Sequence, residues 1–349
     1  MSPLIFTLFA ASVIIGTSIV LASSNWFFIW LGLEINTLAF LPLLVHTHQP
    51  RATEAAVNYF LVQALASTLL LFGGLIQALL SNSWDINTNM LPLTLTLLIS
   101  AVTLNMAIAP FHSWLVDVLQ GVPFQTGLIL TTWQNIAPFS ILLTLPNQPI
   151  WVFFSLGLLS AILGSLGGLN QTQIRNLLAY SAIAHIGWIF TAYPISSQIS
   201  TLALFIYFLI ASTVFITFNL LNSLNLADLS NIIHIAPWLT ALTLLVVLSL
   251  SGLPPLTGFL INWLIILTLA LNSSLIAATI LVSASLISLF FYLRLNYLIV
   301  MSLSPQHTTA TLTWRTIQQT QLTNPILAPL ITISLLGTAL PSMWVSLFS

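Results

Sequence analysis

The segment Leu239-Thr240-Ala241-Leu242-Thr243-Leu244-Leu245-Val246-Val247-Leu248-Ser249-Leu250 runs directly into Ser251-Gly252-Leu253-Pro254-Pro255-Leu256-Thr257-Gly258. The first part is a continuous apolar run, without the apolar and polar alternation of a membrane β-barrel strand, so it predicts a helix. The second part contains two prolines, and proline removes a backbone donor and clashes with the preceding turn. Because apolar residues resume at Phe259 and continue to Leu271, we expect one membrane crossing that is broken in its middle.

The composition of the whole chain agrees with a membrane protein. Among 349 residues there are four arginines, no lysine and five carboxylates, so charged side chains make up 3%, against about 25% in soluble domains. The mean hydropathy is +1.08 and 58% of the residues are hydrophobic. Since a soluble fold could not cover its surface with so few polar groups, the chain is predicted to be an all-helical integral membrane protein.

Apolar runs predict eleven spans, since a crossing of ~30 Å needs about 20 residues. They lie near 3–22, 25–45, 55–80, 91–119, 123–145, 149–168, 175–195, 199–223, 237–271, 274–302 and 324–347. Two of these, 91–119 and 237–271, are too long for one straight crossing. Pro110 interrupts the first, and Pro254 and Pro255 interrupt the second. Broken helices are tolerated in a bilayer where the freed backbone groups line a polar cavity or are buried in protein.

The two interruptions suggest an internal repeat. They fall about 145 residues apart, each in the fourth span of a block of five. Matching interruptions in two halves are the sequence sign of an inverted repeat with a transport path near the breaks. We therefore expect a first repeat over 1–145, a second repeat over 149–302, and a polar loop with a final span over 303–349.

Charge supports one orientation. Counting spans from the N-terminus places all four arginines, at positions 51, 175, 294 and 315, on the side of the N-terminus. Positive residues gather on the cytoplasmic or matrix side of membrane proteins. The N-terminus is therefore predicted to face that side, and the first apolar run, which lacks a basic leader, is expected to remain as a span.

Glu34 is the most informative single residue. It lies about nine residues inside the apolar run 25–45, where an ionised carboxylate needs a partner or water. A capping role at the membrane interface is the alternative. Because intramembrane carboxylates mark ion and proton paths by default, we interpret Glu34 as a functional group.

Two histidines and three asparagines are also placed inside spans. His112 follows the first break, and His185 lies in mid-span with Ser181 one turn before it. Each histidine suits a proton relay or, equally, a hydrogen-bonded buried ring. The three asparagines, Asn105, Asn135 and Asn262, could bond neighbouring helices or hold water, but an amide cannot release a proton at neutral pH.

Several classes of site are excluded by what the sequence lacks. There is no cysteine, which excludes disulfides and iron–sulfur ligation. The sequence shows no phosphate-binding glycine loop, no dinucleotide motif and no metal-ligand spacing, so nucleotide, flavin and metal sites are not expected. Four scattered arginines do not make a nucleic-acid surface.

Six blocks of this sequence form a recognisable set: Trp30–Leu38, Pro50–Ala55, Ile108–Trp114, Leu169–Arg175, Ala179–Trp188 and Gly252–Phe259. Together they closely resemble the subunit 2 family of the NADH dehydrogenase in mitochondrial respiratory complex I. The match runs in order over almost the whole chain. The resemblance implies an antiporter-like, proton-translocating subunit of the inner membrane without a cofactor of its own. Flavin, iron–sulfur clusters and quinone would be bound by other subunits, and the partners would be neighbouring complex I membrane subunits and lipids.

The sequence departs from the family at its most important positions. In the family, lysines stand where this chain has Asn105, Asn135 and Asn262, and with the glutamate matching Glu34 they form the charged axis that moves protons. Here all three are asparagine, and the chain has no lysine at all. Because some mitochondrial codes read AAA as Asn, translation with such a code would produce this pattern in one step. We interpret the three asparagines as lysine positions; genuine asparagines are the alternative.

Two rival functions follow from the same features. A stand-alone cation/proton antiporter would share the broken helices but would normally carry more ionisable groups than Glu34 and two histidines. A scaffold subunit that has lost pumping would fit genuine asparagines at all three lysine positions. The preferred prediction is a proton-translocating subunit of NADH:ubiquinone oxidoreductase, with no redox chemistry on this chain.

Overall fold

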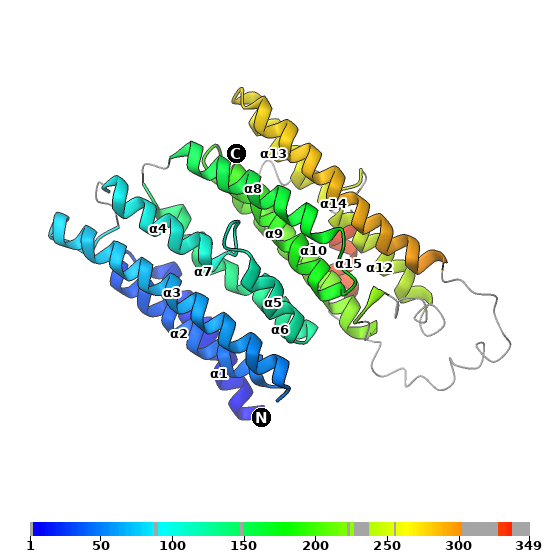
Figure 1. The fold of residues 1–349 in the computed structure, drawn as a ribbon, viewed down its shortest axis with the longest axis horizontal. Coiled ribbons are helices and arrows are strands. Elements are labelled where there is room, and N and C mark those ends of the chain that lie inside the picture. Colours follow the sequence, from blue (N-terminus) through cyan, green and yellow to red (C-terminus); the bar gives the residue numbers. More distant parts are fainter. Residues whose placement is uncertain are drawn as a thin grey trace. The chain divides into compact units, whose positions relative to one another are not determined.

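The computed structural model describes residues 3–86, 90–146, 149–221, 224–226, 237–254, 256–301 and 327–336. Its internal contacts divide the chain into two compact units, Met1–Ile150 and Trp151–Ser349. Within each unit the helices run side by side (Figure 1). The regular structure of the described residues is helical, apart from two isolated β-bridges, as the composition predicts.

The first unit contains three long helices followed by several short ones. The long helix α3 packs against α2, α4 and α5, while α1 packs against α2 and α7. Their order is α1 (Pro3–Ala22), α2 (Trp26–Val45), α3 (Pro50–Ser81), α4 (Pro92–Asn105), α5 (Ser113–Gly121), α6 (Phe124–Thr131), the 3₁₀ turn η1 (Trp133–Asn135) and α7 (Ile136–Thr144).

In the second unit, α10 is the central helix and contacts α9, α12, α13 and α15. α14 packs against α12 and α13. The helices of this unit are α8 (Ile150–Gly168), α9 (Ile174–Ala192), α10 (Ser197–Leu221), α12 (Pro237–Leu250), α13 (Thr257–Leu271), α14 (Leu275–Met301) and α15 (Leu327–Leu336).

The helices lie where the apolar runs predict spans, and both predicted breaks are present. α4 is separated from α5 around Pro110, and α12 from α13 around Pro254. Among the described residues, six helices are long and apolar enough to cross a membrane by themselves, so the count of eleven crossings stays a prediction. Pro255, the loop 302–326 and most of the last predicted span fall outside the described residues.

The prediction of one continuous helix over 123–145 is wrong. The chain forms α6, then the 3₁₀ turn η1, then α7. Pro138 explains the interruption, because it has no N–H for the carbonyl of Gln134 and its ring clashes with that carbonyl. Thr131 and Thr132 stabilise the turn before it, since their hydroxyls donate to carbonyls of Gly127 and Leu128 at 2.7–3.2 Å.

The first two helices of each unit approach each other in the same way. A β-carbon added to Gly16 in α1 would lie 2.9 Å from both the backbone nitrogen of Asn36 and the carbonyl oxygen of Gly32 in α2. In α8, a β-carbon on Gly164 would lie 2.6 Å from the nitrogen of Ala184 and 2.9 Å from the carbonyl oxygen of Tyr180 in α9. Each residue of the second set follows its counterpart by 148 positions, from Gly16 to Gly164.

The connecting loops repeat this correspondence. An isolated β-bridge joins Asn25 to Asp85, and another joins Gln173, again 148 positions after Asn25, to Asn225. Backbone bonds close both bridges: two link residues 24–26 with 84–86 and two link residues 172–174 with 224–226, at 3.0–3.1 Å. In each unit the loop after the first helix is therefore tied to the loop after the third.

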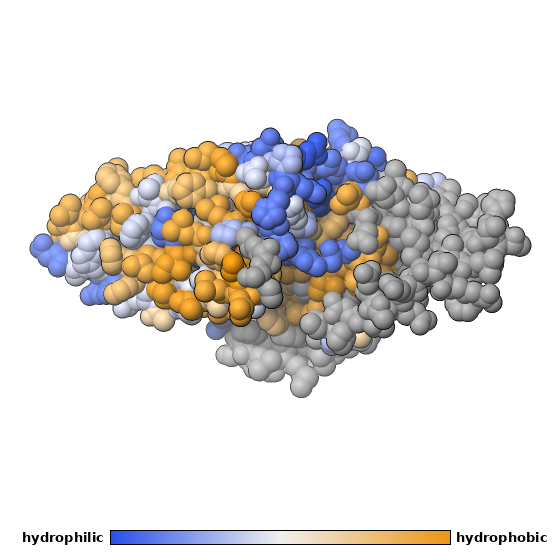
Figure 2. Space-filling model, turned by 90° about the horizontal axis from the view of Figure 1, so that it is seen from below, coloured by the Kyte–Doolittle hydropathy of each residue, from blue (hydrophilic) through white to orange (hydrophobic). Residues whose placement is uncertain are grey.

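Large apolar side chains cover much of the outer surface. Leu4, Leu79, Trp151 and Ile276 are each about four-fifths exposed, and broad hydrophobic areas are visible on the face in view in Figure 2. An exposed surface of this kind is stable against lipid and not against water. It agrees with a protein whose solvent is the bilayer.

Candidate functional site

The first helix break places Asn105 at the last residue of α4. Beyond it, Ala107 adopts the left-handed conformation, with a φ of 53°, and the N–H of Ile108 donates to the carbonyl of Thr103 at 3.0 Å. The carbonyl of Leu104 accepts from the N–H of Ala107 at 3.3 Å and from the indole of Trp114 in α5 at 3.1 Å. The break therefore exchanges regular helix bonds for side-chain and turn bonds, and it directs the end of α4 inward.

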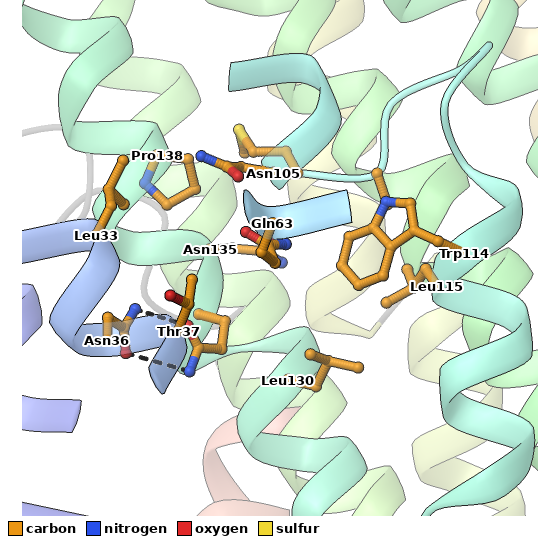
Figure 3. A pocket seen from close by; sticks show the side chains of 13 residues that line it. Leu33, Asn36, Thr37, Gln63, Asn105, Trp114, Leu115, Leu130, Asn135 and Pro138 are labelled. Atoms are coloured by element: carbon orange, nitrogen blue, oxygen red, sulfur yellow. Dashed lines mark hydrogen bonds between the residues drawn. The ribbon is translucent and has the colours of Figure 1, made fainter. Parts of the chain in front are cut away.

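A small polar pocket lies beside this break. Figure 3 shows Asn105, Gln63 and Asn135 around the same space, which is also lined by Asn36, Thr37, Gln134 and apolar side chains from α2, α5, α6 and α7. The amides of Asn36, Gln63, Asn105 and Asn135 are all less than a tenth exposed. The pocket offers about 10 Å³ to the centre of a water molecule, which is close to the least that one water needs.

The amides of Asn105 and Asn135 differ in their hydrogen bonding. The side-chain oxygen of Asn105 is buried and has no hydrogen-bond partner among the described residues. Asn135 donates back to the carbonyl of Thr131 at 2.8 Å, one turn earlier. A buried acceptor without a donor costs about 1–3 kcal/mol, so the pocket is suited to a water molecule or to a different side chain at position 105.

A reciprocal amide pair holds η1 against α2. The Asn36 amide donates to the Gln134 side-chain oxygen at 2.7 Å, and the Gln134 amide donates back to Asn36 at 3.2 Å (Figure 3). Both partners are separated by 98 residues in the chain. The pair fixes the turn that carries Asn135 next to the pocket.

Glu34 lies on α2 but outside the pocket lining. Its carboxylate is half-buried and accepts a hydrogen bond from the Ser67 hydroxyl of α3 at 3.0 Å. Asn36 and Thr37, which line the pocket, lie on the same helix less than one turn further along. The structure thus brings Asn105 and Asn135 together, while Glu34 lies outside the lining on the helix that contributes Asn36 and Thr37.

His112 is placed apart from the lining side chains. It is the N-cap residue of α5, is half-buried, and makes no side-chain cap hydrogen bond. Its Nδ1 atom is buried without a partner. The histidine therefore belongs to the first break, while the pocket is built from amides.

Asn262 and His185, the two predicted residues of the second unit, each lie next to the second break. The N–H of Gly252 donates to the carbonyl of Ser249 at 3.1 Å, with a φ of 76°. A β-carbon there would lie 2.5 Å from the side-chain nitrogen of Asn262, whose side-chain oxygen is buried without a partner. His185 of α9 stacks on Tyr207, with ring centroids 5.3 Å apart, and interacts with the backbone of Leu250 at the end of α12.

Several site residues were missed by sequence reasoning. Asn36, Gln63, Ser67 and Gln134 are neutral, so they do not stand out from an apolar run as a charge does. The available signal was weak: Gln63 and Ser67 are four residues apart, as required for one helix face. Among the described residues, no cluster of three acidic, histidine or cysteine side chains could hold a metal ion.

Known proteins are similar to this sequence along nearly the whole chain. A family described as "NADH:quinone oxidoreductase/Mrp antiporter, TM" matches residues 23–288, and one described as "NADH dehydrogenase subunit 2 C-terminus" matches residues 289–344. The chain is 45% identical to NADH-ubiquinone oxidoreductase chain 2 of Tetraodon nigroviridis over 322 residues, which cover 92% of each protein. The chain belongs to the NADH-ubiquinone oxidoreductase chain 2 family. Chain 2 of Xenopus laevis is 44% identical over 90% of this chain and 92% of its own length.

Solved structures agree with membership of the chain 2 family. A chain in the structure of respiratory complex I from Thermus thermophilus with bound aureothin superposes with a TM-score of 0.83 at 25% identity, covering 98% of this chain and 80% of that one. A chain of the Mrp complex from a Dietzia species shares the fold, with a TM-score of 0.82 at 17% identity over 97% of this chain and 75% of its own.

These relatives establish what this member of the chain 2 family does. It is a proton-translocating, antiporter-like membrane subunit of respiratory complex I, and thus part of NADH:ubiquinone oxidoreductase. The resemblance seen in the sequence blocks is confirmed.

Proposed function

We propose that protons pass through the first unit by way of Glu34 and the pocket that holds Asn105 and Asn135. The observation that carries this proposal is the convergence of both positions on one buried polar pocket beside the helix break. His112 at the start of α5 and the freed backbone groups of the break add further polar partners. In the second unit, His185 and Asn262 flank the other break and continue the same function there.

Electrostatic coupling gives such a site its driving force. Glu34 can hold or release a proton, and its stability in either state depends on charges in its low-dielectric surroundings. At an effective dielectric of about 20, a unit charge moving to within ~7 Å contributes roughly 2.4 kcal/mol. That energy changes proton affinity roughly fifty-fold, which is enough to load and unload a site in sequence.

At positions 105 and 262 lysine fits the local chemistry better than asparagine, and position 135 lines the same pocket as position 105. The side-chain oxygens of Asn105 and Asn262 are buried without donors, whereas a lysine ammonium carries donors only. A lysine would remove the orphan acceptor at either position, and a lysine at position 105 would place an ammonium group in the pocket. We therefore propose that the native chain has lysine at these positions.

We further propose that the chain crosses the inner mitochondrial membrane eleven times, with its N-terminus toward the matrix. The 148-residue correspondence of helix contacts and loop bridges supports two repeats over 1–145 and 149–302, followed by 303–349. An odd number of spans per repeat makes the second repeat inverted. Neighbouring antiporter-like subunits and lipids would cover the apolar surface, and flavin, iron–sulfur clusters and quinone would be bound by other subunits.

The substitution Glu34→Gln tests the proton path. It keeps the shape of the side chain and can still accept from Ser67, but it removes the titrating group. We expect an assembled complex whose proton pumping and coupled NADH oxidation are reduced by about tenfold or more. Asp85→Asn is the matched control, because it removes the same charge from an exposed loop residue and should pump normally.

The result that would overturn the path is an assembled Glu34→Gln complex with an unchanged number of protons per NADH. Such a result would favour the scaffold alternative. That alternative also depends on genuine asparagines, so the coding DNA and the intact mass of the native chain distinguish the two. A native mass that exceeds the written sequence by the Lys–Asn difference at each position supports the pump; a mass equal to the written sequence contradicts the lysine proposal.

A further inference from the structure

The Ser67 hydroxyl lies between two acceptors. Its oxygen is 3.0 Å from Oε2 of Glu34 and also 3.0 Å from the carbonyl oxygen of Ala64, one turn earlier in α3. A hydroxyl has one proton to donate and can itself accept. It therefore satisfies one of these acceptors at a time, and rotation about one bond exchanges them without any movement of the oxygen.

The two orientations match the two charge states of Glu34. When the carboxyl group is ionised, the hydroxyl proton points to Oε2 and forms a charge-assisted bond. When the carboxyl group is protonated, it can donate to the Ser67 oxygen while the hydroxyl proton points to Ala64. The serine is 2% exposed, so within the protein this exchange needs little reorganisation of solvent.

Ser67 also lies on the way from Glu34 to the pocket. α2 and α3 pack against each other, with Glu34 opposite Ser67 and, further along, Phe40 opposite Tyr59 with ring centroids 5.4 Å apart. Gln63, four residues before Ser67 on the same helix face, lines the pocket with Asn105 and Asn135. The hydroxyl is thus one helical turn from a residue of the pocket wall.

We propose that Ser67 relays the proton between Glu34 and water at the Gln63 end of the pocket, an inference that rests on the proposed role of Glu34. The carboxyl O–H bond of Glu34 breaks as a new O–H bond forms on Ser67. The original Ser67 proton turns from the Ala64 carbonyl toward the water and leaves to it, giving a hydronium ion and the Glu34 carboxylate. The reverse sequence reloads Glu34, so the serine is regenerated in each cycle.

The test compares assembled complexes carrying Ser67→Ala, Ser67→Thr or Ser165→Ala. Ser165 is the matched control, since it is fully buried and its hydroxyl donates to the backbone carbonyl of Ile162. We expect Ser67→Ala to slow coupled turnover about tenfold or more, to change its pH profile and to increase its solvent isotope effect. Ser67→Thr keeps the hydroxyl and should restore all three readouts, and Ser165→Ala should leave them as in the parent complex.

Infrared difference spectroscopy detects the hydrogen bond between Glu34 and Ser67 through the carboxyl stretching band of Glu34. The carboxyl band that disappears in Glu34→Gln should shift to higher wavenumber in Ser67→Ala and stay in place in Ser67→Thr. If Ser67→Ala does not assemble, Ser67→Cys preserves the volume with a weaker donor and should give an intermediate turnover.

The outcomes separate the two proposals. If Ser67→Ala turns over normally while Glu34→Gln is defective, the relay alone is overturned. The relay alone is also overturned if Ser67→Thr is as defective as Ser67→Ala, or if Ser67→Cys has the turnover of the parent complex. Normal pumping by Glu34→Gln overturns both the relay and the role of Glu34.

Discussion

At the scale of single residues, the Asn36–Gln134 pair controls the position of the pocket wall. Replacing Gln134 with Leu leaves the Asn36 amide buried without its partner, which costs about 1–3 kcal/mol. The double variant Asn36→Leu/Gln134→Leu leaves neither polar group unpaired. Its loss in free energy of unfolding should therefore be smaller than the sum of the losses in the two single variants. Hydrogen exchange measured in the assembled complex should be faster around residues 131–136 in each single variant.

Strictly additive exchange changes in the double variant would contradict this coupling. Ser140→Ala is a suitable control, because that serine is in α7 and its hydroxyl donates only within the helix, to Ala137.

Residue chemistry also explains which site members the sequence could predict. Glu34 stands out because a charge in an apolar run needs a reason. Gln134 does not, because an amide in a membrane helix is common and its partner lies 98 residues away. The family resemblance identified Asn105 and Asn135, but their meeting in one pocket came from the structure.

At the scale of secondary-structure elements, the turn between α12 and α13 depends on Gly252. Its φ of 76° is strained for any residue with a β-carbon, and such a carbon would lie 2.5 Å from the Asn262 side-chain nitrogen. We expect Gly252→Ala to lower the free energy of unfolding by about 1–3 kcal/mol and to displace the side chain of Asn262. The measurement is the half-life of coupled activity of the assembled complex at a raised temperature.

Gly73→Ala in α3 is the control, since the nearest atom to its new β-carbon is Cδ2 of the flexible Leu98 side chain, at 3.2 Å. Equal losses in the two variants would show that the left-handed turn is not what makes Gly252 necessary.

Proline position explains both the success and the failure in predicting helix breaks. Pro110 and Pro254 lie beside glycine, histidine or further proline residues, and the long apolar runs around them could not cross a membrane straight. Pro138 lies in a run of ordinary length, so its effect on the carbonyl of Gln134 was overlooked. Pro42 lies inside α2 without ending it, and proline alone therefore does not determine where a helix stops.

At the scale of the whole molecule, orientation in the membrane is directly testable because the chain has no cysteine. A single cysteine at Ser83, in the loop after α3, should react with a membrane-impermeant maleimide applied to mitochondria whose outer membrane has been removed. One at Thr47, in the loop after α2, should react only after the inner membrane is permeabilised. The opposite pattern would reverse the predicted matrix location of the N-terminus.

The repeat was only partly predictable from the sequence. The two breaks suggested a spacing of about 145 residues, whereas the glycine contacts and loop bridges give 148 in the first helix pair. Side chains differ between the copies: Glu34 corresponds to Ala182 by this spacing. What the two units share is the close approach of the backbones of their first two helices. In the sequence, only scattered glycines indicate this approach.

The loop bridges also bear on how the protein is made. The bonds between residues 24–26 and 84–86 can form only after the ribosome has delivered three helices and the loop that follows the third. These two bonds, a first loop clasp, therefore close only after α1, α2 and α3 have all been synthesised. A second clasp at 172–174 and 224–226 repeats the same step later in translation, so we expect biogenesis to advance in two comparable stages.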